Sequence, residues 1–173
     1  MKLTAANRVK KPAPAPPPEV PAEQPAAADE TTAEKAAVKP RAKQTVLAKH
    51  TTEMPPGWNG KADQTITMGT LPGLKFDLEQ ITVRAGSKIK LIFNNNDDML
   101  HNFVVVSPGA ADEVGTMALK LGVQGEQKHF IPNTPKVLAH TAILQPGKSE
   151  TIYFTVPEQP GTYPYLCTYP GHY

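Results

Sequence analysis

Short runs in which apolar and polar residues alternate follow one another from Trp58 to the end of the chain. Runs of this kind, separated by Gly, Pro, Asn and Asp, predict β-strands that bury one side and expose the other. The predicted strands are 65–68, 80–84, 88–94, 101–106, 141–144, 151–156 and 161–167. Seven short strands in an all-β pattern predict a Greek-key β-sandwich.

One segment, 110–139, interrupts the alternation. Residues 110–121 space their apolar side chains as a helix does. The sequence therefore predicts a short helix in a flap outside the sandwich.

Residues 1–57 have a different composition from the rest. Eight prolines lie within the first forty residues, and no Phe, Tyr or Trp precedes Trp58. A segment of this composition buries too little apolar surface to offset the entropy of ordering it, and 12–18 favours extended polyproline II. We expect a disordered Pro/Ala-rich linker over 1–57 and one folded domain over 58–173. The alternative for 31–49 is a solvent-exposed amphipathic helix.

Charge is distributed unevenly between these two parts. Residues 1–50 carry nine Lys and Arg against five Asp and Glu, a net +4, and the remaining residues carry nine against eleven, a net −2. The predicted domain is slightly acidic and has no basic stripe with interleaved aromatic residues, which argues against nucleic-acid binding. No run of 18 apolar residues predicts a membrane-spanning helix. The first residues lack the apolar core of a signal peptide, so either the protein is cytoplasmic or its natural start lies further upstream.

The candidate chemistry lies in three residues. Cys167 is the only cysteine, which excludes an intrachain disulfide and any Cys-x-x-Cys motif. His172 follows it across a Pro-Gly turn, and His101 opens the apolar run 101–106. Two imidazoles and one thiolate are the donor set that favours copper in electron-transfer sites. The alternatives are a buried inert thiol for Cys167 and a core histidine for His101.

The sequence Cys-Thr-Tyr-Pro-Gly-His at 167–172 and Leu-His-Asn-Phe-Val-Val at 100–105 resemble azurins and auracyanins, the blue-copper proteins of the cupredoxin family. The resemblance covers about 62–173. It implies a cupredoxin β-sandwich and one mononuclear copper ion bound by His101, Cys167 and His172. It further implies a weak contact from the backbone carbonyl of Leu100, and an Asn102 that holds the ligand loop and donates toward the thiolate sulfur.

Another stretch that resembles azurins, 137–141, contains a histidine that is not a ligand in the family. His50, His129 and His140 are therefore expected to be ordinary surface residues.

The family usually places an axial methionine a few residues after the second histidine, followed by a final strand. All five methionines here precede Cys167. We expect that the sequence is a fragment cut within the copper loop, that its continuation carries Met three to five residues after His172, and that the missing final strand leaves one sheet with an open edge.

The function implied is single-electron transfer between redox partner proteins such as cytochromes or dehydrogenases, outside the cytoplasm, in the periplasm or on the outer face of a bacterial membrane. The arm is expected to tether the domain to an upstream anchor or to another redox domain. An enzyme is not expected: Cys167 is followed by Thr168, no His-x-His pair occurs, and no general base accompanies the motifs. Two alternatives stay open, namely a copper storage or chaperone protein and the terminal copper module of a larger oxidoreductase.

Overall fold

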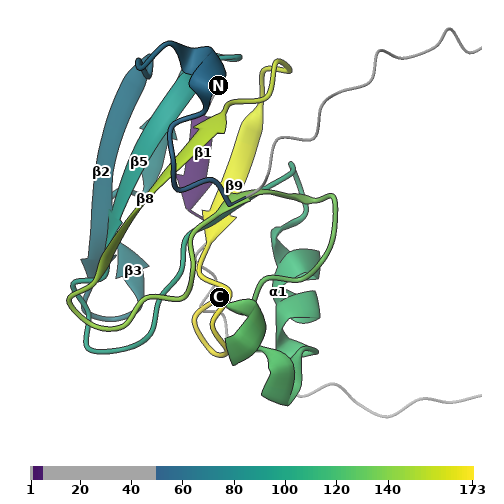
Figure 1. Cartoon of the computed structure of the whole chain (residues 1–173). Helices are drawn as coiled ribbons and strands as arrows, with labels where there is room; N and C mark the ends of the chain where they lie inside the picture. The colour runs from purple at the N-terminus through teal and green to yellow at the C-terminus, as the bar shows by residue number, and fades with distance from the viewer. Residues whose placement is uncertain (1, 6–49) are drawn as a thin grey trace, which may run out of the picture. The chain divides into compact units, whose positions relative to one another are not determined.

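The computed structural model describes residues 2–5 and 50–173, which form two packed β-sheets and one α-helix (Figure 1). One sheet has the strand order β3-β2-β5-β8 and the other the order β4-β1-β9-β6-β7. The strands are β1 Lys2–Ala5, β2 Gln64–Leu71, β3 Lys75–Phe76, β4 Gln80–Thr82, β5 Lys88–Asn94, β6 Val104–Val106, β7 Val137–His140, β8 Ser149–Thr155 and β9 Thr162–Leu166. The helix is α1 Ala111–Leu119, and short 3-10 turns lie at Pro56–Trp58, Gly122–Gln124 and Glu126–Lys128. The predicted β-sandwich is confirmed.

Strand β5 shows why this sequence forms a two-layered structure. Its residues Ile89, Leu91 and Phe93 are fully buried, and Lys90 and Ile92, which lie between them, are half-buried. Alternate side chains of a strand point to opposite faces of the sheet, so this pattern commits one face to the interior. β5 pairs in parallel with β2 and antiparallel with β8, which makes it a central strand.

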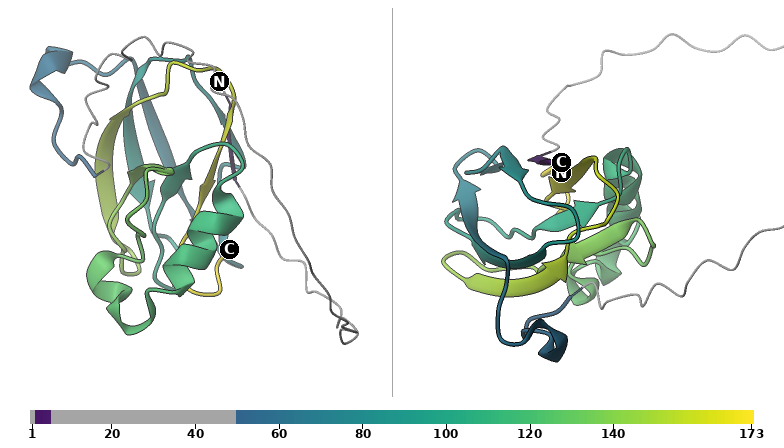
Figure 2. Two further views of the ribbon diagram at one scale, coloured as in Figure 1. Left: turned by 90° about the vertical axis from the view of Figure 1, so that its right-hand side faces the viewer. Right: turned by 90° about the horizontal axis from the view of Figure 1, so that it is seen from above.

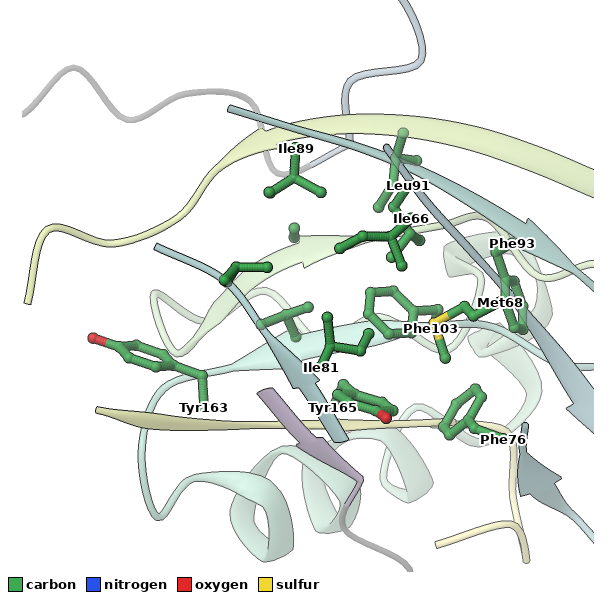
Figure 3. Packing of buried hydrophobic residues seen from close by; sticks show 14 of the residues in the cluster. Ile66, Met68, Phe76, Ile81, Ile89, Leu91, Phe93, Phe103, Tyr163 and Tyr165 are labelled. Carbon is green, nitrogen blue, oxygen red and sulfur yellow. The ribbon is translucent and has the colours of Figure 1, made fainter. Parts of the chain in front are cut away.

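Between the sheets, four aromatic rings pack against one another (Figure 3). Phe93 comes from the four-stranded sheet, and Tyr165 comes from the five-stranded sheet. The ring centroids of Phe76 and Tyr165 are 5.3 Å apart, and those of Phe103 and Tyr165 are 5.2 Å apart. Ring pairs of this spacing contribute about 1 kcal/mol each beyond the burial of their surface. Phe103 therefore packs in the sandwich interior, two residues after His101.

Helix α1 covers the outer face of the five-stranded sheet, as Figure 2 also shows. Its buried residue Val114 packs with Val104, Val106 and Leu166 of that sheet. Strand β6 therefore buries both faces, which explains why its three valines show no alternation. The predicted helix over 110–121 is confirmed.

One predicted strand is wrong. Residues 141–144 do not form a strand; β7 lies immediately before them and pairs with β6. The reason is that side chains take over the hydrogen bonds that a strand would make. The hydroxyl of Thr141 accepts from the N–H of Phe103 at 2.9 Å, and the N–H of Ala142 donates to Glu150 at 2.7 Å. Only Leu144 returns to the sheet, in an isolated bridge with His101.

The sequence also gave no indication of β1 or β3. β1 lies within the segment expected to be a disordered linker, yet it pairs antiparallel with β4 and in parallel with β9. The strand that leads to Cys167, β9, has a partner on each side, and the open edge expected from a missing final strand remains a prediction. Residues 6–49 lie outside the described residues, and the division into linker and domain remains a prediction. Among the described residues, no helix has the length and apolarity needed to cross a membrane.

Candidate metal centre

Three donor side chains meet where the two sheets end near the C-terminal loop. His101, Cys167 and His172 place one potential ligand atom each within 4.8 Å of the other two. All three side chains are buried, and the rings of His101 and His172 have centroids 4.5 Å apart. Cys167 Sγ lies 3.5 Å from Nδ1 of His172. This is the only such group among residues 2–5 and 50–173.

His101 is held by the backbone of the sandwich. Its N–H donates to the carbonyl of Leu144 at 3.2 Å, and its own carbonyl accepts from Leu144 at 2.7 Å. The loop before it is organised by the buried Asn95, whose side-chain amide donates to the carbonyls of Met99 and Leu144. The backbone that carries this imidazole is therefore held by the sandwich.

Cys167 and His172 belong to one loop. Cys167 directly follows β9, and the N–H of His172 donates to the carbonyl of Tyr169 at 3.1 Å. Gly171 has φ 88°, a left-handed conformation that glycine adopts without steric cost. The ring of Tyr169 lies 4.9 Å from that of His172 and 5.1 Å from that of Phe130. The second histidine is therefore positioned by a tight turn and by aromatic packing.

Asn102 joins the two halves of the centre. Its backbone N–H points to Cys167 Sγ at 3.5 Å, and its side-chain amide donates to Thr168 Oγ1 and to the carbonyl of His129. Its side-chain oxygen accepts from the N–H of Thr168 at 2.8 Å. Asn102 and Thr168 are fully buried, so these hydrogen bonds have no competition from water.

Asp97 contacts the first histidine. Its Oδ2 lies 3.2 Å from Nε2 of His101, and both side chains are almost fully buried. Burial alone would raise the pKa of Asp97, but hydrogen bonds from Asp98 and the contact with His101 outweigh it, and the pKa is lowered. Because Nε2 faces a carboxylate, Nδ1 is the nitrogen of His101 left for a metal.

The electrostatics of the three donors fit a bound cation. Burial raises the pKa of the Cys167 thiol to about 11, although the N–H groups of Asn102 and Tyr169 oppose this. Burial lowers the pKa of His101, and burial together with the neighbouring His101 lowers the pKa of His172 to about 4. Nε2 of His172 is buried without a hydrogen-bond partner. Neutral imidazoles and a thiol that needs a positive charge to ionise are what a thiophilic metal requires.

The structure brings the three predicted ligands together with Asn102, and His172 is only 7% exposed. It differs from the sequence analysis in one place. His140, expected to be an ordinary surface residue, is half-buried and stacks on His50. Leu100 is half-buried, and the role of its carbonyl remains a prediction.

Sequence reasoning missed Asp97, Thr168 and the pair Phe130 and Tyr169. Asp97 lies four residues before His101, but nothing in the sequence distinguishes it from its neighbour Asp98. Thr168 directly follows the candidate cysteine, and this was the one available signal. Phe130 reaches the centre only because the segment after α1 folds over it.

Comparison with known proteins agrees with this site. The profile of copper-binding proteins of the plastocyanin/azurin family matches residues 62–173. The chain is 36% identical to auracyanin-B of Chloroflexus aurantiacus over 115 residues, 64% of this chain and 48% of that protein. It thus spans about half the length of that relative. It is 25% identical to the copper-resistant cuproprotein CopI of Rubrivivax gelatinosus, covering 68% of this chain and 65% of CopI.

Solved structures resemble the fold as well. An auracyanin from the photosynthetic bacterium Roseiflexus castenholzii, in its reduced form, has a TM-score of 0.58 and 37% identity, covering 65% of this chain and 90% of that chain. Auracyanin A of Chloroflexus aurantiacus, described as a "blue" copper protein, has a TM-score of 0.57 and 30% identity, covering 64% and 90%. The donor set fits one mononuclear copper ion. This chain therefore belongs to the plastocyanin/azurin family of copper-binding proteins, the cupredoxins.

Proposed function

We propose that this protein carries single electrons on one copper ion bound by His101, Cys167 and His172. The observation that carries the proposal is the convergence of two neutral imidazoles and one thiol, all buried, within 4.8 Å of one another. This is the donor set of blue-copper electron-transfer sites, and copper supplies the change between Cu(II) and Cu(I).

The residues around the donors support rapid electron exchange by limiting movement. Cu(I) and Cu(II) favour different geometries, so a rigid set of ligands reduces the rearrangement that accompanies each electron. Asn102 links the segment of His101 to the segment of Cys167 through two side-chain hydrogen bonds to Thr168 and one backbone contact to the sulfur of Cys167. We assign to Asn102 the role of fixing the sulfur, and the carbonyl of Leu100 would contribute a weak contact to a bound copper ion.

A carrier rather than an enzyme fits the same residues. The relatives that are auracyanins and azurins are likewise copper proteins of the carrier type. Fusion to an oxidoreductase remains a proposal that sequence beyond this chain would test.

Copper loading of the wild type and of Cys167→Ser tests the function. The Cu(II) protein should show the intense visible absorption of a copper–thiolate bond, and one electron from a reductant should bleach it reversibly. Cys167→Ser should lack the band, because serine cannot supply the thiolate. Lys148→Ala is the control, because it changes an exposed side chain far from the donors in sequence and should keep the band. A colourless wild-type Cu(II) protein would rule the proposal out.

The partners we propose are redox proteins such as cytochromes or dehydrogenases, met in the periplasm or elsewhere outside the cytoplasm. Pro170 and Gly171 are exposed beside the buried His172, and Met99 is 43% exposed beside Leu100. These residues offer a small apolar surface next to the donors, and interfaces of this kind between redox proteins are weak and transient. Substitution of Met99 by Lys should slow electron exchange and leave the visible band unchanged.

A second candidate is copper tolerance or storage. The similarity to the copper-resistant cuproprotein CopI favours it. The two functions differ in kinetics: a carrier exchanges electrons repeatedly without losing copper, whereas a storage protein releases the ion to an acceptor. Stopped-flow oxidation and reduction in the presence of a copper chelator would distinguish them.

A further inference from the structure

A second group of metal-ligating side chains lies away from the copper centre. His140 ends β7, Glu150 lies in β8, and His50 belongs to the segment before β2. The rings of His50 and His140 stack with centroids 5.0 Å apart and planes inclined by 25°. Nε2 of His50 lies 3.2 Å from Oε2 of Glu150, and their side chains are 32% and 18% exposed. Two imidazoles and a carboxylate therefore share one partly buried place.

His140 already has the arrangement of a metal-binding histidine. Its Nδ1 lies 3.0 Å from the backbone carbonyl of Thr141. A carbonyl can only accept, so Nδ1 carries the proton and Nε2 keeps its lone pair. Histidines that bind metals usually donate their other N–H to such a carbonyl. Burial is the main cause that lowers the pKa of His140, and the neighbouring His50 and His129 add to it, while Thr141 and Glu150 act in the opposite direction. The ring is therefore neutral at neutral pH.

The contact between His50 and Glu150 has the spacing of two ligands of one ion. Nε2 of His50 is buried and makes no aligned hydrogen bond, although Oε2 of Glu150 is only 3.2 Å away. Two donors bound tetrahedrally at about 2.1 Å from zinc lie about 3.4 Å apart. The same Oε2 accepts from the N–H of Ala142 at 2.7 Å, which orients the carboxylate.

We propose that His50, His140 and Glu150 form a second metal site, for a divalent ion such as Zn²⁺ or Cu²⁺. The donors of the trio are not all within 4.8 Å of one another, so binding would require at least one of the three side chains to change its conformation. Imidazole and carboxylate ligands suit both ions. Without a thiolate, Cu²⁺ bound here would not produce the intense visible band of the first centre.

A metal at this site would fasten the segment around His50 to the sandwich. That segment already touches β8, where the N–H of Tyr153 donates to the carbonyl of Thr51 at 2.8 Å. An ion bound by residues of the segment, β7 and β8 would bind the folded protein and not the unfolded chain, and so would stabilise the fold.

The test is a calorimetric titration with Zn²⁺ of the full chain loaded with one equivalent of Cu²⁺. We expect one equivalent of Zn²⁺ to bind, the visible band to persist, and the melting temperature to rise. His50→Ala, His140→Ala and Glu150→Gln should each weaken Zn²⁺ binding by about tenfold or more. The persisting visible band in each variant would show that the protein is folded.

His129→Asn is the matched control. It removes an imidazole outside the trio and keeps a residue type that tolerates the left-handed backbone found there, with φ 52°. It should bind Zn²⁺ with an affinity within about twofold of the wild type, a change of less than 0.5 kcal/mol. The absence of a Zn²⁺ equivalent, loss of the visible band on adding Zn²⁺, or equal losses in His129→Asn and the trio variants would overturn the proposal.

The same titration in Cys167→Ser separates this site from the first one. If the two sites are independent, this variant should still bind Zn²⁺ through the trio, and His140→Ala added to it should remove that binding. Zn²⁺ binding that disappears with Cys167→Ser alone would place the ion at the first centre and contradict the second site.

Discussion

The two candidate histidine ligands are held by different means. His101 forms a two-way backbone bridge with Leu144, and its Nε2 contacts the buried carboxylate of Asp97. His172 lies at the end of a turn closed by one backbone hydrogen bond to Tyr169, and its Nε2 has no hydrogen-bond partner. Both rings are buried, yet one is fixed by hydrogen bonds on both sides and the other mainly by packing. Position in the sandwich, rather than ligand type, decides how firmly each is held.

The largest effect on stability is expected at Asn102, which joins the segment of His101 to the segment of Cys167. Asn102→Ala removes the acceptor of the buried Thr168 N–H and two donated hydrogen bonds. Leaving buried polar groups unpaired should lower the free energy of unfolding by about 3 kcal/mol. The visible copper band should also weaken as the loop carrying His172 moves. Denaturant titration and absorption measure both.

Asn96→Ala is the control for that substitution, since Asn96 is exposed. It should change the unfolding free energy by about 0.5 kcal/mol or less. Equal losses in the two variants would show that Asn102 does not connect the halves.

The next effect concerns His101 alone. Asp97→Asn removes a buried negative charge 3.2 Å from Nε2 of His101. Partners of this kind orient a ligand histidine and increase its basicity, so Cu(II) affinity should fall by about tenfold. Cu(I) carries less charge and should be affected less, which raises the reduction potential. Competitive titration and voltammetry measure these changes. Asp77→Asn makes the same change of charge at an exposed position and should leave both values unaltered.

Acid should act mainly through His172. Burial and the neighbouring His101 lower the pKa of this residue in the fold from 6.5 to about 4. Between these two values the unfolded chain binds the proton and the folded chain does not, so stability of the metal-free protein should decrease as the pH falls from 6.5 towards 4. Thermal melts across this range measure the slope. His172→Gln should flatten it; an unchanged slope in that variant would assign the effect to other groups.

The smallest effect should come from the packing around His172. Tyr169→Leu removes ring contacts with both His172 and Phe130. Loss of these aromatic pairs should cost about 1 kcal/mol of unfolding free energy. Because the donors themselves remain, the copper band should shift only slightly. If copper binding were lost as completely as in Cys167→Ser, the packing of Tyr169 would be essential for holding His172 in place.

Some residues of the site could be identified from the sequence, and others could not. Cys167 and His172 were identified as candidates from their residue types and spacing, and His101 from the resemblance of its surrounding sequence to azurins. Asp97, Thr168 and Phe130 were not, because an aspartate, a threonine or a phenylalanine becomes part of a site only through its neighbours in space. The same holds for the proposed trio. His50 lies 90 residues before His140 and 100 before Glu150, and the three come together only in the folded protein.

The sequence by itself determined the β-sandwich, the helix after β6 and the three candidate copper donors. Alternation in β5 and helical spacing in α1 are local patterns, and each reports directly which side of an element is buried. The tertiary structure alone decided that β7 ends at His140, since a side chain of Thr141 replaces a backbone hydrogen bond to Phe103. It also decided that β1 fills the place between β4 and β9. Strand pairing joins residues distant along the chain, and its free energy depends on partners that no local pattern names.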